Sequence, residues 1–122
     1  MTMKESIEHY LDEHHYFGSG TSSIAPADEV AEAIDNGALI LDVRTGREVK
    51  KGTAPGAQNI SVFVLKHHLD ELPRDRTIVT CCMTGMRAGK ARDILDRNGF
   101  TVLNGGPFPA LTEMIEKNET TD

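Results

Sequence analysis

The spacing of apolar residues changes repeatedly along this chain, and each change marks a predicted strand or helix. Short runs without helical periodicity predict strands at 38–41, 58–61, 78–80 and 100–103. Apolar residues three or four positions apart predict helices over 26–35, 62–72, 88–97 and through 111–115. Because strands and helices alternate, we expect an α/β fold with a mainly parallel sheet of about five strands and helices on both faces.

Residue types at the ends of these segments set their limits. Ser22 or Ser23 is expected to cap the first helix, since a serine side chain accepts a hydrogen bond from the first turn, and Asn36-Gly37 to end it. Ser61 is expected to cap the second helix in the same way. Asn104-Gly105-Gly106-Pro107 is predicted to turn into the last helix.

A separate helical pattern precedes these elements. Residues 4–17 carry apolar side chains at helical spacing, and Gly18-Ser19-Gly20 ends the pattern. We therefore expect an N-terminal helical extension over residues 1–20, with an amphipathic helix, and one domain over 21–122. The helix either packs on the domain as a lid or contacts a second copy or another partner.

Size and charge exclude several classes of protein. The 122 residues fit one domain, and a formal charge of −6 argues against nucleic acid or an anionic membrane as a partner. No apolar run approaches the roughly 20 residues of a membrane span, and the first residues lead into polar sequence instead of a signal core. We therefore expect a cytoplasmic protein.

The two cysteines lie where a strand meets a helix. Cys81 and Cys82 follow the apolar run 78–80, and the next helix opens near Arg87. Backbone N–H groups and the positive end of the helix dipole favour an anion or a thiolate in such a loop. Two adjacent cysteines form no disulfide framework, and no second cysteine pair or histidine spacing predicts a metal site. The segment therefore predicts covalent catalysis through a cysteine thiolate.

Charged residues follow the strand over 38–41. In open α/β sheets the ligand crevice lies outside the carboxyl ends of the strands, so Asp42 and Arg44 are expected to face the same crevice as the cysteine loop. The alternative is structural: Arg44 or Arg47 bridges Glu48 and fixes the shape of this loop without touching substrate.

Three blocks in order resemble the single-domain rhodaneses, sulfurtransferases that carry sulfur as a cysteine persulfide. Residues 41–48 (Leu-Asp-Val-Arg-Thr-Gly-Arg-Glu) are similar to the family's Asp-x-Arg-x-x-x-Glu turn. Residues 52–60 (Gly-Thr-Ala-Pro-Gly-Ala-Gln-Asn-Ile) match its Gly-His-Ile-Pro-Gly-Ala-x-Asn-Ile block, and 82–87 (Cys-Met-Thr-Gly-Met-Arg) its Cys-x-x-Gly-x-Arg loop. The resemblance spans about residues 24–115 and includes Asn98-Gly99-Phe100 and Gly105-Gly106 near the end.

This resemblance implies a three-layer rhodanese-like fold and a set of site residues. Cys82 is the expected nucleophile, with no metal or organic cofactor, and Cys81 is either a buried strand residue or a resolving thiol. The implied partners are a small anionic sulfur donor and a thiol or cyanide acceptor, or a sulfur-carrier protein. The expected substrate-binding residues are those of the loop: Met83, Thr84, Gly85, Met86 and Arg87. The expected supporting residues are Asp42, Arg44 and Glu48.

Several positions depart from the family pattern. Thr53 stands where the family usually has His, Ala88 where Ser or Thr often follows the loop Arg, and Pro107-Phe108 where Trp often follows the Gly pair. Met83 and Met86 bring no charge to the loop. Because thiosulfate is a dianion, we expect slow turnover with thiosulfate, and a persulfide-bearing protein or a low-molecular-weight thiol as the natural partner.

Two other functions remain open at this point. Cys81 to Arg87 also reads Cys-x₅-Arg, the spacing of cysteine phosphatases and arsenate reductases, although no Asp is obviously placed as the acid such an enzyme needs. A rhodanese-like module that binds without catalysis is the other alternative, and the retained Cys82 and Arg87 argue against it. Whether the protein is a monomer or a homodimer does not follow from the sequence.

Overall fold

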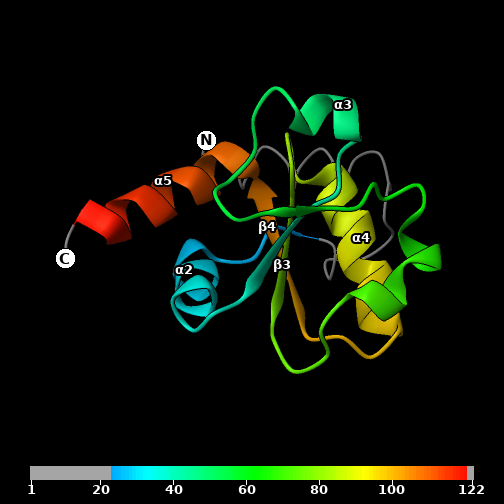
Figure 1. The fold of residues 1–122 in the computed structure, drawn as a ribbon. Helices are drawn as coiled ribbons and strands as arrows, with labels where there is room; N and C mark the ends of the chain where they lie inside the picture. The colour runs from blue at the N-terminus through cyan, green and yellow to red at the C-terminus, as the bar shows by residue number, and fades with distance from the viewer. Residues whose placement is uncertain (1–22, 121–122) are drawn as a thin grey trace.

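The computed structural model describes residues 23–120, and these form a parallel sheet with helices on both faces (Figure 1). The strands are β1 (Leu39–Asp42), β2 (Gln58–Asn59), β3 (Ile78–Cys82) and β4 (Val102–Pro107). The helices are α2 (Ala27–Asp35), α3 (Gly46–Val49), α4 (Met86–Arg97) and α5 (Phe108–Thr120), with 3₁₀ turns η2 (Leu65–His67) and η3 (Leu69–Glu71). The predicted extension over residues 1–20 lies outside the described residues.

The sheet has the strand order β2-β1-β3-β4, and every neighbouring pair is parallel. This confirms the α/β class with a parallel sheet; within residues 23–120 the strands number four, against the expected five or so. Because all strands run the same way, Asp42, Cys82 and Pro107 end at one edge of the sheet, where α3 also lies (Figure 1).

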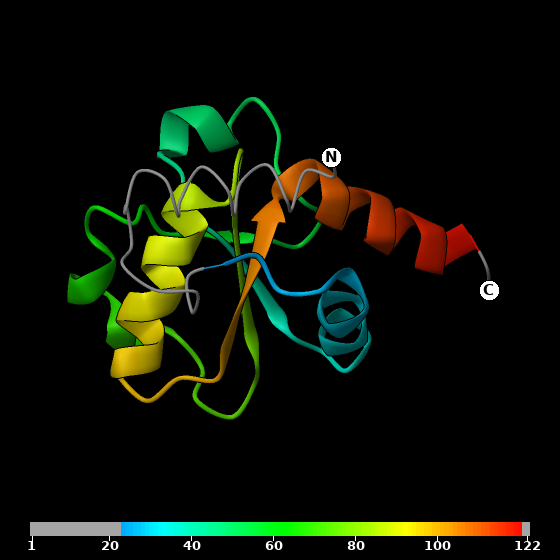
Figure 2. The same cartoon turned by 180° about the vertical axis from the view of Figure 1, so that it is seen from behind.

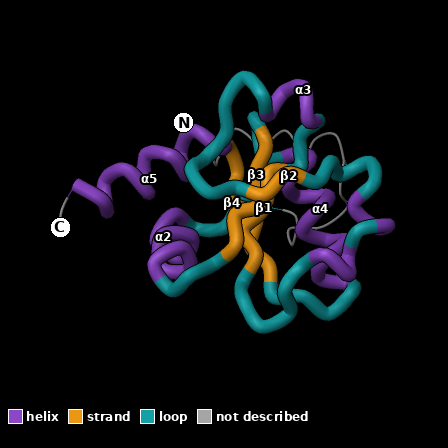
Figure 3. The backbone as a smooth tube through the Cα atoms, viewed as in Figure 1, coloured by secondary structure: helices purple, strands orange, loops and turns teal. Residues whose placement is uncertain are grey.

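Helices cover the two faces separately, as the views from the front and from behind both show (Figure 2). The helix α4 and the two 3₁₀ turns lie on one face, and α2 and α5 lie on the other (Figure 3). The sheet therefore forms the middle layer of three, as expected.

Of the described helices, none is both long and apolar enough to cross a membrane.

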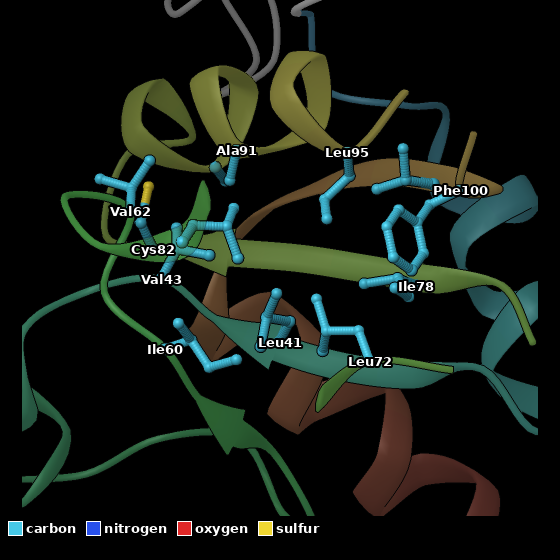
Figure 4. Packing of buried hydrophobic residues seen from close by; sticks show 13 residues of the cluster. Leu41, Val43, Ile60, Val62, Leu72, Ile78, Cys82, Ala91, Leu95 and Phe100 are labelled. Carbon is cyan, nitrogen blue, oxygen red and sulfur yellow. The ribbon is translucent and has the colours of Figure 1, made fainter. Parts of the chain in front are cut away.

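Each face of the sheet has its own hydrophobic core. On the α4 face, Leu41 and Ile78 pack with Leu95 of α4 and with Phe100 (Figure 4). On the other face, Ile40 and Val79 pack with Val30 of α2 and Leu111 of α5. Successive strand residues point to opposite faces, so neighbours in sequence belong to different cores. Burying each of these large side chains contributes roughly 1.5–3 kcal/mol.

The predicted helix over 62–72 is wrong, because the segment begins as an extension of the sheet. The backbone N–H of Val62 donates to the carbonyl of Val43 at 2.9 Å, which holds the start of the segment extended. Ser61 does not cap a helix; its hydroxyl accepts from the N–H of Phe63 at 3.3 Å, which closes a local turn. Only the two short 3₁₀ turns η2 and η3 form after it.

The first helix begins differently from the prediction. Pro26 occupies the N-cap of α2 without a side-chain hydrogen bond, so Ser23 is not the cap; Ser22 lies outside the described residues. Before the helix, the Ala25 N–H donates to the carbonyl of Asn104 at 2.8 Å, which ties this segment to β4. Asn36 and Gly37 end the helix as predicted.

The predicted turn over 104–107 is instead the end of β4. The pairing between β3 and β4 is irregular there, since Thr80 pairs with Asn104 but Cys82 pairs with Pro107. Gly105 allows this close approach, because a Cβ at its position would lie 2.5 Å from Cγ1 of Val79. The longer strand brings β4 alongside the cysteines.

Candidate active site

The Cys82 thiol lies at the carboxyl end of the central strand β3, below the start of α4. Cys82 is 1% exposed, and its side chain packs with Val43 and Val62 in the core on the α4 face (Figure 4). The backbone N–H of Gly85 donates to Sγ at 2.9 Å. A hydrogen bond to sulfur stabilises negative charge there, so this thiol has a donor already in place for a thiolate or persulfide.

Gly85 makes this geometry possible because it turns the chain sharply from strand to helix. It is the N-cap of α4, and its φ of 98° lies in the left-handed region that favours glycine. A Cβ on Gly85 would lie 2.8 Å from Cδ1 of Ile24, which packs directly over it. The positive end of the α4 dipole therefore points at the sulfur across one tight turn.

The other loop side chains occupy different positions around the thiol. Met83 and Thr84 are exposed, and Met86 is half-buried at the first position of α4. The Thr84 hydroxyl accepts from the N–H of Met86 at 3.3 Å and thereby supports the start of the helix. Both exposed residues of the loop, Met83 and Thr84, are therefore uncharged.

Arg87 pairs with Glu48 of α3 through both arms of its guanidinium. The nitrogens Nη1 and Nη2 of Arg87 donate to Oε1 and Oε2 of Glu48 at 2.7 Å and 2.9 Å, respectively. This hydrogen-bonded pairing lowers the pKa of Glu48 from its ordinary value of 4.5 to about 2 and raises the pKa of Arg87. The expected alternative, in which Arg44 or Arg47 bridges Glu48, is wrong, because Arg87 fills that position.

Glu48 is fixed from its own side as well. Thr45 and Glu48 form a reciprocal capping box at the start of the short helix α3. The Thr45 N–H and hydroxyl donate to Oε1 of Glu48 at 3.2 Å and 3.1 Å. The carboxylate therefore holds Arg87 from a pre-organised position.

Asp42 and Arg44 form a second ion pair, and it is buried. Asp42 is fully buried and accepts from Nη2 of Arg44 at 2.8 Å and from the Thr53 hydroxyl at 2.6 Å. Arg44 also donates to the carbonyl of Gly52 at 2.6 Å and lies 4.1 Å over the Phe108 ring. Thr53, where the family has His, thus serves to satisfy Asp42.

This second pair lies on the face away from Cys82. Asp42 is the register partner of Cys81, and parallel neighbours in register point to the same face of a sheet. Arg44 contacts Phe108 of α5 on that face. The prediction that Asp42 and Arg44 share the crevice of the cysteine loop is therefore wrong for their side chains, which brace the loop that follows β1.

Cys81 points into the core between the sheet and the helices α2 and α5. It is fully buried there with Val79 and Leu111, whereas Cys82 belongs to the opposite core. Burial raises the pKa of the Cys81 thiol, and the nearby charge of Asp42 adds to the effect. Cys81 therefore has the placement of a buried strand residue, with its sulfur away from the Cys82 loop.

A Cys81→Ser variant tests this placement. Because the Cys81 sulfur faces away from the loop, we expect turnover at the Cys82 thiol to stay within roughly twofold of the parent rate. Burying a hydroxyl there is expected to lower the free energy of unfolding by about 1–2 kcal/mol. Steady-state assays and urea titrations measure the two effects. A rate loss as large as that of Cys82→Ser, in a folded variant, would show that Cys81 takes part in the chemistry.

Asn104 is a part of the site that the sequence interpretation missed. It is 1% exposed on β4, and its Nδ2 donates to the Gly85 carbonyl at 3.1 Å. Its Oδ1 accepts from the N–H of Gly106 at 2.9 Å. Asn104 thereby ties the cysteine loop to the end of β4. The signal that could have revealed it is a polar residue between apolar Leu103 and a glycine pair.

Metal chemistry has no ligand set in the described part of the chain. Between residues 23 and 120, no group of three or more His, Cys, Asp or Glu side chains is arranged to hold an ion. The arrangement instead offers one buried thiol, a backbone donor to its sulfur and an arginine held by a carboxylate. This combination suits nucleophilic attack by sulfur on a small donor.

Comparison with known proteins agrees with this geometry. Residues 26–108 match the rhodanese-like domain family. YtwF of Bacillus subtilis, provisionally named a sulfurtransferase, is 33% identical over 98 residues, which cover 79% of this chain and 94% of YtwF. A sulfurtransferase of Allochromatium vinosum is 33% identical over 67 residues, covering 54% of this chain and 63% of that protein, so the chain matches under two thirds of its length.

Among solved structures, the reduced CoADR-RHD protein of Bacillus anthracis has the same fold over most of this chain. It is 29% identical and superposes with a TM-score of 0.64. The match covers 78% of this chain and 17% of that protein, so this chain corresponds to a small part of it.

Proposed function

Because the chain belongs to the rhodanese-like sulfurtransferase family, we propose that it transfers sulfane sulfur through a persulfide on Cys82. The observation that carries this proposal is the Gly85 N–H donating to the Cys82 sulfur at the start of α4. A persulfide at this position keeps negative charge within reach of the same donors.

In the first half of the cycle, the Cys82 thiolate attacks the outer sulfur of a donor. A new S–S bond forms on Cys82 as the bond within the donor breaks. With thiosulfate, the bonding pair leaves on sulfite; with a persulfide R–S–SH, it leaves on the thiolate RS⁻. No electron acceptor is needed, because the donor already carries sulfur at the oxidation level of the product.

In the second half, an acceptor removes the outer sulfur. Cyanide attacks this sulfur to give thiocyanate, or a thiolate attacks it to give a new persulfide, and Cys82 leaves as the thiolate. The Gly85 N–H and the positive end of the α4 dipole stabilise the charge on sulfur in both halves, so the same groups serve the whole cycle.

The rival use of Cys81 with Arg87 gains no support from this geometry. A phosphatase needs the first cysteine as thiolate beside the loop, whereas Cys81 is buried on the opposite face with a raised pKa. The Cys82 thiol is the one that lies at the loop, which favours the spacing of four residues between Cys82 and Arg87. A non-catalytic module would have no use for a thiol with a donor already in place.

Steady-state kinetics test the proposed cycle. Because the enzyme releases the first product before the acceptor reacts, initial rates of thiocyanate formation should give parallel double-reciprocal lines when donor and cyanide are varied. Thiosulfate and cysteine persulfide would each be used as donor, with the uncatalysed rate subtracted. Intersecting lines would contradict a persulfide intermediate, and rates no higher than without protein, with both donors, would contradict the enzyme itself.

A further inference from the structure

The charge around the Cys82 loop is nearly balanced. Residues 83–86 carry no charged side chain, so Arg87 is the cation of this loop. Arg87 gives both arms of its guanidinium to Glu48, and these two side chains are 31% and 36% exposed. A carboxylate at 2.7 Å cancels most of the field that Arg87 would direct at a bound anion.

This balance persists across the pH range in which the protein would work. Arg87 lowers the pKa of Glu48 to about 2, so the carboxylate stays ionised well below neutral pH. Because the pKa of Glu48 is lowered in the folded protein, the ion pair with Arg87 stabilises the fold fully above about pH 4.5. This contribution is lost as the pH falls through about 2. Near pH 7, therefore, protonation of Glu48 does not release Arg87.

Arg44, which lies at the same edge of the sheet, does not replace Arg87. Arg44 is 4% exposed, pairs with Asp42 and lies over Phe108 on the opposite face. Close to the sulfur, the contacts are instead neutral: the Gly85 N–H and the apolar side chains of Val43 and Val62. Met83, the residue after Cys82, is 48% exposed and brings no charge to the loop.

We propose that Glu48 is a specificity-determining residue, which makes this site favour sulfur donors of low charge, such as cysteine persulfide, over dianionic thiosulfate. Thiosulfate brings two negative charges, and both leave on sulfite, so it gains most from an uncompensated cation. When the donor is a low-molecular-weight persulfide, the leaving group is a thiolate with one negative charge. The backbone N–H of Gly85 is then sufficient to stabilise the charge on the Cys82 sulfur. This inference rests on the proposed function.

A Glu48→Gln variant tests the inference. The amide keeps the size of the side chain but removes its charge, so Arg87 regains its field at the loop. We expect the ratio of kcat/KM for thiosulfate to kcat/KM for cysteine persulfide, with cyanide as acceptor, to rise by roughly tenfold. Glu116→Gln on α5 is the matched control, since it makes the same charge change at an exposed position and should leave the ratio unchanged.

Two further measurements separate specificity from damage to the loop. Glu48→Asp keeps the negative charge and should keep the donor ratio of the parent. For the parent itself, kcat/KM for thiosulfate should fall less than about twofold between 20 and 200 mM salt, because a balanced site attracts a dianion weakly. This measurement needs no variant, so it tests the inference even where Glu48→Gln does not fold.

The results that overturn the inference differ from those that overturn the function. If the parent turns over and folded Glu48→Gln has the same donor ratio, the proposed role of Glu48 is overturned but the proposed function is not. A steep fall of kcat/KM for thiosulfate with salt in the parent has the same consequence. No turnover by the parent with either donor overturns the proposed function, and the role of Glu48 with it. A raised ratio in Glu48→Gln, absent in Glu48→Asp and Glu116→Gln, supports the inference.

Discussion

Replacing Cys82 by serine is expected to lower the rate of sulfur transfer by at least about 10³-fold, to the level of the uncatalysed reaction. The serine hydroxyl fits the space beside Val43 and Val62, but it is not ionised near neutral pH and cannot carry a sulfur atom. The loss should therefore appear in kcat with every donor and acceptor. Thiocyanate formation from cysteine persulfide and cyanide measures it.

Cys81→Ser is the matched control for this variant, because it makes the same atomic change one residue away on the opposite face of the sheet. A melting curve for each variant shows whether the fold is kept. If folded Cys82→Ser kept more than a tenth of the parent's transfer rate, Cys82 would not be the nucleophile.

Gly85→Ala is expected to lower the free energy of unfolding by about 2–4 kcal/mol. Two causes add: the φ of 98° strains any residue with a Cβ, and that Cβ would lie 2.8 Å from Cδ1 of Ile24. Relief of the clash shifts the loop and moves the Gly85 N–H away from the sulfur, so transfer should also slow. Urea unfolding and the thiocyanate assay measure the two effects.

Gly56→Ala separates the two causes. Gly56 has a φ of 76° and no atom within 4 Å of an added Cβ, so its substitution should cost only the backbone strain, about 1 kcal/mol. In an Ile24→Ala background, the extra cost of Gly85→Ala should shrink, since the contact is gone. Equal losses for Gly56→Ala and Gly85→Ala would show that the packing of Ile24 on the loop is unimportant.

The architecture followed from the sequence because its signals are local. Short apolar runs predicted the strands β1, β3 and β4, and the short segment 58–61 after a turn cluster predicted β2. The alternation of these segments with helical patterns implied the parallel sheet. The pattern over 62–72 misled because its apolar spacing is helical, whereas the pairing of Val62 with Val43 is a contact across the sheet. Sequence periodicity carries no information about such long-range hydrogen bonds.

The candidate site was predictable in its parts but not in its pairings. Strand alternation already implies that Cys81 and Cys82 point to opposite faces, yet only the packed structure shows which face meets the loop. The partner of Glu48 is Arg87, thirty-nine residues away, and nearer arginines were the natural expectation. Asn104 was missed because its contacts to Gly85 and Gly106 depend on the irregular end of β4.

The most direct test of the Cys82 persulfide is the intact mass of the reduced protein after incubation with cysteine persulfide or with thiosulfate, followed by desalting. Cys81→Ser and Cys82→Ser would be treated in parallel. We expect one added sulfur atom on the parent and on Cys81→Ser, none on Cys82→Ser, and loss of the added atom on exposure to cyanide. Added sulfur on Cys82→Ser, or none on the parent with either donor, would contradict sulfur transfer through Cys82.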